Sequence, residues 1–86
     1  MINTTRPLTQ QQATLTHGGH TVRVQLAYEP ITDRGLKWAV STKSYIRGHF
    51  TGSRVLWRDE DLTACRAAFS TEIARLERKG WTRKTN

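Results

Sequence analysis

Three histidines and one cysteine, His17, His20, His49 and Cys65, are the residues that could bind a transition metal or act as nucleophile and base. Zinc sites usually draw on ligand pairs at close spacing, as in a cysteine knuckle or a histidine pair on a helix. His17 and His20 are three apart around two glycines, and Cys65 falls on the apolar side of a predicted helix, where cysteine acts as a small hydrophobic residue. We therefore expect no metal site. A reactive thiol needs an exposed, electropositive setting, so we expect no Cys–His nucleophile either.

Asp59, Glu60 and Asp61 form a cluster of carboxylates that could serve acid–base catalysis. They directly precede a run with helical periodicity, where a capping aspartate and acids near the positive end of the helix dipole account for them. Gly18-Gly19 matches neither the phosphate-binding loop of nucleotide hydrolases nor the dinucleotide-binding pattern. The sequence thus predicts a protein that is not an enzyme and has no cofactor.

The segment KSYIRGHFTGSRVLW, residues 43–57, alternates basic with aromatic residues, as surfaces that contact polyanions do. The net charge is +7, and residues 36–58 contain five basic residues and no acid. Phosphate contacts are better predicted than base stacking, because we expect Trp38, Trp57 and Phe50 to face or flank the core. The alternative is a solvated surface that keeps a small domain soluble. The predicted contact residues are Arg23, Lys37, Lys43, Tyr45, Arg47, Arg54 and Arg58.

Strand alternation would position these side chains. Residues 13–29 read as a hairpin around Gly18-Gly19, since two glycines adopt the positive φ angles of a tight turn. Residues 36–43 alternate again, Gly48 and Gly52 are expected to bracket a turn, and residues 53–57 make a short further strand. The expected apolar face comprises Val22, Val24, Leu26, Tyr28, Leu36, Trp38 and Val40. The expected outer face comprises Arg23, Gln25, Ala27, Lys37, Ala39, Ser41 and Lys43.

A helix is predicted over residues 61–79. Its apolar positions recur three or four residues apart, which places them on one side of a helix. Gly80 fits a left-handed cap that would let Trp81 fold back on Leu76. The expected stripe is Leu62, Cys65, Phe69, Ile73 and Leu76.

One apolar helix stripe and one apolar sheet face predict an α+β domain of two layers. We expect a small antiparallel β-sheet of three to four strands, packed on one C-terminal α-helix, with the other sheet face open. Residues 1–12 would be a flexible N-terminal arm, 13–81 the single domain and 82–86 a basic C-terminal tail. This outline resembles the arm-type DNA-binding domains of phage integrases, which lay a sheet into the major groove. The likeness is of fold alone, with no sequence motif behind it.

The expected setting is a reducing cytoplasm, because a single cysteine permits no internal disulfide. No apolar run reaches the ~20 residues that cross a bilayer, so no membrane partner is expected. The predicted function is a small basic binding module that contacts nucleic acid, DNA or RNA, through its open basic face. The alternative is an inhibitor encoded by a phage or mobile element, similar to anti-CRISPR proteins. It would dock on an acidic or nucleic-acid-handling protein or block its nucleic-acid channel. The sequence does not define the oligomeric state.

Overall fold

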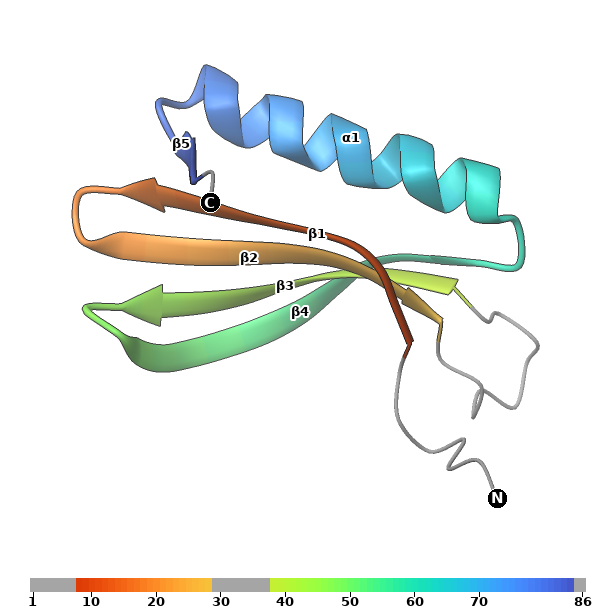
Figure 1. Ribbon diagram of the computed structural model, residues 1–86, viewed down its shortest axis with the longest axis horizontal. Coiled ribbons are helices and arrows are strands. Elements are labelled where there is room, and N and C mark those ends of the chain that lie inside the picture. Colours follow the sequence, from red (N-terminus) through yellow and green to blue (C-terminus); the bar gives the residue numbers. More distant parts are fainter. Residues whose placement is uncertain (1–7, 29–37, 85–86) are drawn as a thin grey trace.

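The computed structural model describes residues 8–28 and 38–84. They form β1 (Leu8–His17), β2 (His20–Tyr28), β3 (Trp38–Ile46), β4 (His49–Asp59), α1 (Leu62–Arg78) and β5 (Thr82–Lys84). The strands build one antiparallel sheet in the order β4-β3-β2-β1-β5, and α1 runs along one of its faces (Figure 1). The predicted combination of an antiparallel sheet with one C-terminal helix is confirmed, with five strands in place of three or four.

Two tight turns connect the long strands. Gly18 and Gly19 join β1 to β2 with φ angles of 54° and 84°, which confirms the predicted hairpin. Arg47 and Gly48 join β3 to β4 with φ angles of 51° and 84°. The second turn is therefore shorter than the expected turn between Gly48 and Gly52, and β4 starts at His49. The two tips lie together, since the Arg47 N–H donates to the carbonyl of Gly19 at 3.0 Å.

Both ends of α1 are capped as their residue types predict. The Asp61 side chain accepts a hydrogen bond from the Thr63 N–H at 2.9 Å. At the other end, the Trp81 N–H donates to Leu76 and the Gly80 N–H donates to Glu77, the paired bonds of a Schellman motif. Gly80 has a φ of 98°, as the left-handed cap requires. Trp81 consequently folds back against the core beside Leu76.

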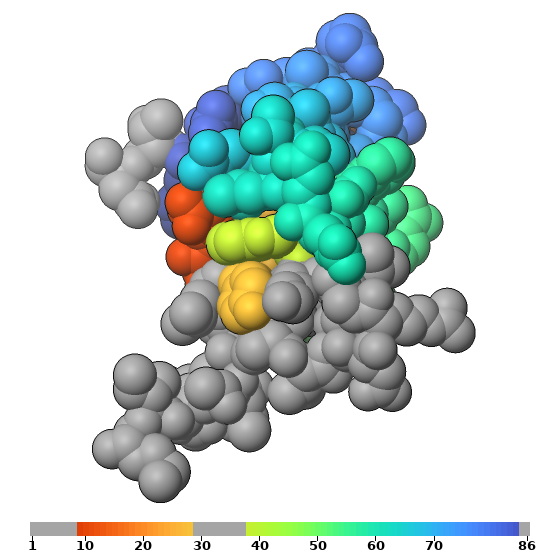
Figure 2. All heavy atoms as spheres, turned by 90° about the vertical axis from the view of Figure 1, so that its right-hand side faces the viewer, coloured from red at the N-terminus to blue at the C-terminus, as the bar shows by residue number. Residues whose placement is uncertain are grey.

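The core lies between α1 and the facing side of β1, β2 and β3. Helix residues of the predicted stripe interlock with alternate strand residues, and Trp38, Leu56, Leu62, Ala68 and Trp81 pack around the margin. Figure 2 looks at the end where α1 begins and shows the first helical turns stacked on β2 and β3. The buried set is Ala13, Leu15, Val22, Val24, Leu26, Val40, Cys65, Phe69, Ile73 and Leu76. This confirms the predicted helix stripe, with Leu62 half-buried, and the sheet residues Val22, Val24, Leu26 and Val40.

The strands extend beyond the domain boundaries that the sequence suggested. β1 begins at Leu8, inside the predicted arm, because residues 8–17 pair with β2 along its length. Residues 82–84 of the predicted tail form β5, which pairs with β1 through Thr82, Arg83 and Lys84. The Schellman motif turns the chain back at Gly80 and delivers it to the free edge of β1. In the described part of the chain, no helix has the length and apolar character needed to cross a membrane.

Candidate functional site

The sheet face opposite α1 carries two neighbouring rows of side chains that run across the strands. We call Lys84, Thr14, Arg23, Lys43 and Ser53 the cationic row, because strand pairing places them side by side from β5 to β4. The second row, which we call the aromatic row, lies two residues along β5, β1, β2 and β3 from the first, and three residues along β4 because of the extra residue Thr51. It comprises Thr82, Thr16, Thr21, Tyr45 and Phe50. Both rows lie at the end of the sheet that holds the two hairpin tips.

Arg23 connects the two rows. Its guanidinium carbon lies 5.9 Å from the centre of the Tyr45 ring, and the Tyr45 and Phe50 rings meet edge to face at 5.7 Å. The Nε–H of Arg23 is buried and has no hydrogen-bond partner within residues 8–28 and 38–84. Packing against Tyr45 therefore holds this arginine, and no ion pair with a carboxylate in that part of the chain neutralises its charge.

A polar hollow of about 490 Å³ opens beside Arg23, over β2, β1 and β5. Arg23 and Lys84 bring two cations to it from the open face, and hydroxyl and amide groups lie between them. Arg83, the register partner of the core residue Leu15, lines the hollow from β5. Guanidinium, ammonium, hydroxyl and amide groups all donate hydrogen bonds to oxyanions. The hollow is therefore built to attract an anion. Its lining is completed by Gln12, Ala13, Thr14 and Thr21.

Charge is divided between the two layers of the molecule. The acids among the described residues are Asp59, Glu60, Asp61, Glu72 and Glu77; Asp59 ends β4, and the other four belong to α1 or to the connection that enters it. The strands and their turns contain no acid before Asp59, the last residue of β4. Their bases are Arg23, Lys43, Arg47, Arg54, Arg58, Arg83 and Lys84. The sheet layer is thus strongly positive, whereas α1 nearly balances its own charge.

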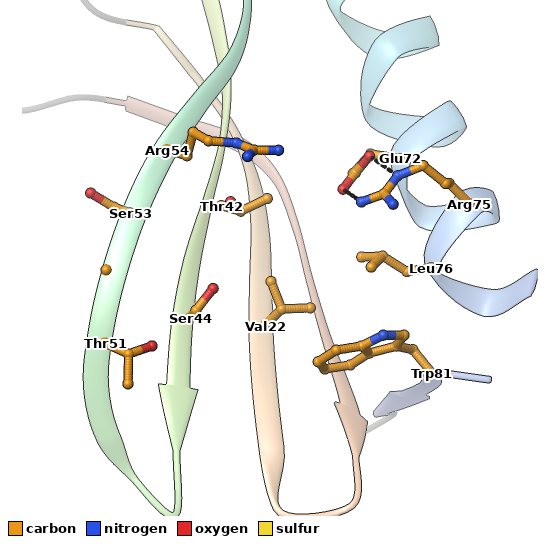
Figure 3. A pocket seen from close by; sticks show the side chains of 11 residues that line it. Val22, Thr42, Ser44, Thr51, Ser53, Arg54, Glu72, Arg75, Leu76 and Trp81 are labelled. Carbon is orange, nitrogen blue, oxygen red and sulfur yellow. Dashed lines mark hydrogen bonds and ion pairs between the residues drawn. The ribbon is translucent and has the colours of Figure 1, made fainter. Parts of the chain in front are cut away.

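Arg54 does not belong to the open face. It pairs with Thr42, which shares the face of Val24, and it reaches toward α1 (Figure 3). There it lines a cleft of about 420 Å³ with Glu72 and Arg75. Glu72 binds Arg75 through two hydrogen bonds, of 2.8 and 2.6 Å, which raise the pKa of Arg75. We expected Arg54 at the rim of the open face; strand register places it on the helix side instead.

The other predicted contact residues lie apart from the two rows. Arg47 is exposed in the turn between β3 and β4. Arg58 is exposed and pairs with Ala39, four residues along β3 from Lys43, a separation of about 13 Å along a strand. Ala27 and Ala39 at that end are buried, whereas Lys43 and Phe50 toward the hairpin tips are exposed. Lys37 lies outside the described residues. The structure thus brings together Arg23, Lys43 and Tyr45 of the predicted set.

Phe50, Arg83 and Lys84 were missed as site residues. Phe50 was expected to flank the core, yet its side chain is 58% exposed on the open face. The reason is the short turn at Arg47-Gly48, which pairs Phe50 with Tyr45. If Arg47-Gly48 is taken as a two-residue turn, the sequence predicts that Tyr45 and Phe50 lie side by side. Residues 83 and 84 lie in a strand of three residues, too short to show alternation.

The tryptophan of β4 lies on the expected face but at its margin. Trp57 was expected to face the helix and flank the core; it pairs with Val40 and lies beside α1, and its side chain is 48% exposed. An extra residue in β4, Leu56, lies between the residues paired with Val40 and Ser41, and it is Leu56 that packs on the core. Trp57 lines a shallow apolar groove along the first half of α1, with Leu56, Ala64, Ala67 and Ala68.

The histidines and the cysteine do not form a site in the described residues. No group of three or more histidine, cysteine or acidic side chains there could hold a metal ion. Cys65 is fully buried against the sheet, and burial, followed by the nearby Asp59 and Asp61 charges, raises the pKa of its thiol. A raised pKa lowers the fraction of reactive thiolate at neutral pH.

We therefore expect Cys65 to react slowly with a thiol reagent in the native protein and rapidly in denaturant. The measurement is the rate of labelling by a chromogenic disulfide at neutral pH, with and without denaturant. The denatured rate serves as the internal control, because Cys65 is the only cysteine in the chain. Equal rates in the two states would contradict the burial described above.

Together these features define a two-layer α+β domain with a cationic, aromatic-bearing open sheet face. Comparison with models of protein families, with curated proteins and with solved structures found no match to the chain. Any function must therefore be argued from the geometry and charge of the site.

Proposed function

We propose that this protein binds nucleic acid through the open face of its sheet. The observation that carries the proposal is the division of charge between the layers. Within residues 8–28 and 38–84, the strands and turns hold seven bases and no acid before Asp59, so the sheet layer as a whole attracts polyanions. Nucleic acids are polyanions whose repeating phosphates can contact a row of cations across a sheet.

Two further features support this function over a merely solvated surface. The cationic row places Arg23, Lys43 and Lys84 at one end of one face, and the hollow lies beside Arg23 and Lys84. Solubilising charges need no such grouping, and mixed signs serve solubility equally well. The rings of Tyr45 and Phe50 on the same face supply surfaces on which bases can stack.

The test is a titration of labelled DNA and RNA with the purified chain at several salt concentrations. Each neutralised phosphate releases counterions, so the logarithm of affinity should fall linearly with the logarithm of salt concentration. Three contacts, as for Arg23, Lys43 and Lys84, predict a slope of roughly −2 on single strands and −3 on duplexes. If no nucleic acid shows saturable, salt-dependent binding at roughly 50 mM salt, the proposal is overturned.

A second candidate function is docking on a partner protein, as an inhibitor or adaptor would do. The groove beside Trp57 favours it, because a half-exposed tryptophan at the edge of a sheet is typical of protein contacts. Affinity capture from a lysate separates the candidates. A partner that survives nuclease treatment and is lost in Trp57→Ser supports docking, whereas material removed by nuclease supports nucleic-acid binding.

A further inference from the structure

We infer that the open face binds a single strand of nucleic acid rather than a duplex, with phosphates along the cationic row and bases on the aromatic row. This inference rests on the proposed function and specifies its ligand. Three observations carry it: the hollow that ends the cationic row, the exposed ring of Phe50, and the spacing between the rows.

The cationic row is suited to a backbone that crosses the strands. Neighbouring strands are about 4.8 Å apart, so Lys84 and Lys43, three strands apart, lie roughly 14 Å from one another. Arg23 lies between them, and the hollow lies at the Lys84 end. Phosphate oxygens can accept hydrogen bonds there from Arg23, Lys84 and the hydroxyl groups of Thr14 and Thr21.

The aromatic row lies where the bases of that strand would fall. On β3 two residues separate the rows, a distance of about 6.8 Å, which is the scale of a nucleotide from phosphate to base, and Phe50 is the register partner of Tyr45. The Tyr45 ring is contacted by the Phe50 ring and by the Arg23 guanidinium. Phe50 therefore has more ring surface available to a base than Tyr45: its side chain is 58% exposed and does not belong to the core.

An exposed phenylalanine distinguishes the two kinds of ligand. In a duplex each base face is covered by the next base pair, so a ring on the surface of a sheet meets only sugars, phosphates or base edges. A single strand offers its base faces, and stacking on an aromatic side chain tolerates any base. Stacking on Phe50 should therefore strengthen the binding of a single strand and leave the binding of a duplex unaffected.

The experiment compares Phe50→Ala with the wild type by fluorescence anisotropy. The probes are an oligothymidine and an oligouridine of about 12 nucleotides, within the usual site sizes, and duplexes of the same length. We expect one or both single strands to bind more tightly than their duplexes. Phe50→Ala should weaken single-strand binding about 5- to 150-fold, the range found on removal of a stacked ring, and leave duplex binding unchanged. Phe50→Trp should restore it.

The matched control is Val55→Ala, which removes another exposed apolar side chain from the open face of β4 and should change neither affinity. Duplexes that bind as tightly as single strands, or a Phe50→Ala variant that loses nothing or loses both equally, would overturn the inference. The proposed function would survive those outcomes, because salt-dependent binding would remain. It fails separately if no probe binds.

Discussion

Replacement of Lys43 and Lys84 by glutamate is expected to abolish nucleic-acid binding while the fold persists. The two lysines stand in the cationic row, on β3 and β5, and both are exposed. Two unit charges about 4 Å apart in water interact by roughly 1 kcal/mol. Reversal turns an attraction into a repulsion of similar size, so two positions change the binding free energy by roughly 4 kcal/mol, nearly a thousandfold in affinity.

The fold should tolerate this double substitution. Exposed lysines without a close carboxylate contribute little to stability, and surface changes of this kind usually alter the free energy of unfolding by less than about 1 kcal/mol. The melting temperature of the variant should therefore stay close to that of the wild type. Anisotropy at roughly 100 mM salt measures the binding, at an ionic strength where charges along the row still interact.

The matched control reverses the same amount of charge on the other layer. Arg66 and Arg78 are exposed on α1, on the far side of the sheet from the two rows. Arg66→Glu with Arg78→Glu gives the same net charge as the sheet variant, at a cost of up to about 1 kcal/mol from the dipole at the helix end. If both variants lose affinity equally, net charge alone governs binding. If the sheet variant is folded and binds as before, the cationic row is not the site.

The parts of the fold that the sequence predicts are those governed by local rules. Asp61, the recurrence of Phe69 and its neighbours, and Gly80 each specify one feature of α1 through residue types close together in the chain. Gly18-Gly19 specifies the first hairpin in the same way. The alternation in β2 then indicates which of its residues face the helix, because a strand cannot rotate without exposing its whole apolar set.

The parts that escape prediction depend on pairing between distant residues. Arg47 occupies the first position of its turn with a positive φ, a conformation that few residues other than glycine adopt, so nothing local signals a two-residue connection. The register of β4 follows from that turn and from two extra residues, Thr51 and Leu56. The turn decides the face of Phe50, Thr51 decides that of Arg54, and the two extra residues together decide that of Trp57.

The candidate site was partly predictable for the same reason. Arg23 and Lys43 follow from alternation within β2 and β3, and they are cross-strand partners in the structure. Lys84 reaches the site through β5, whose pairing with β1 is set by the fold as a whole. The hollow combines residues from β1, β2 and β5, so no single segment of the sequence encodes it.

Phe69→Ala is expected to have the largest effect on stability of any single truncation in α1. The Phe69 side chain is 4% exposed and lies at the centre of the stripe, between Cys65 and Ile73. Truncation of a buried phenylalanine to alanine typically costs about 3–5 kcal/mol, the lost transfer free energy plus the cavity. Small domains have free energies of unfolding of roughly 5–15 kcal/mol, so the variant loses a large share of its stability or unfolds.

Denaturant titration followed by circular dichroism measures this cost as the shift of the unfolding midpoint. Ser70→Ala, at the adjacent exposed position, is the control, and it should leave the midpoint nearly unchanged because it removes no core contact. If Phe69→Ala does not fold, Phe69→Leu keeps the site apolar and should cost less, so the ranking of the variants still reports burial. A midpoint for Phe69→Ala equal to that of Ser70→Ala would show that Phe69 is not part of the core and that a different face of α1 packs against the sheet.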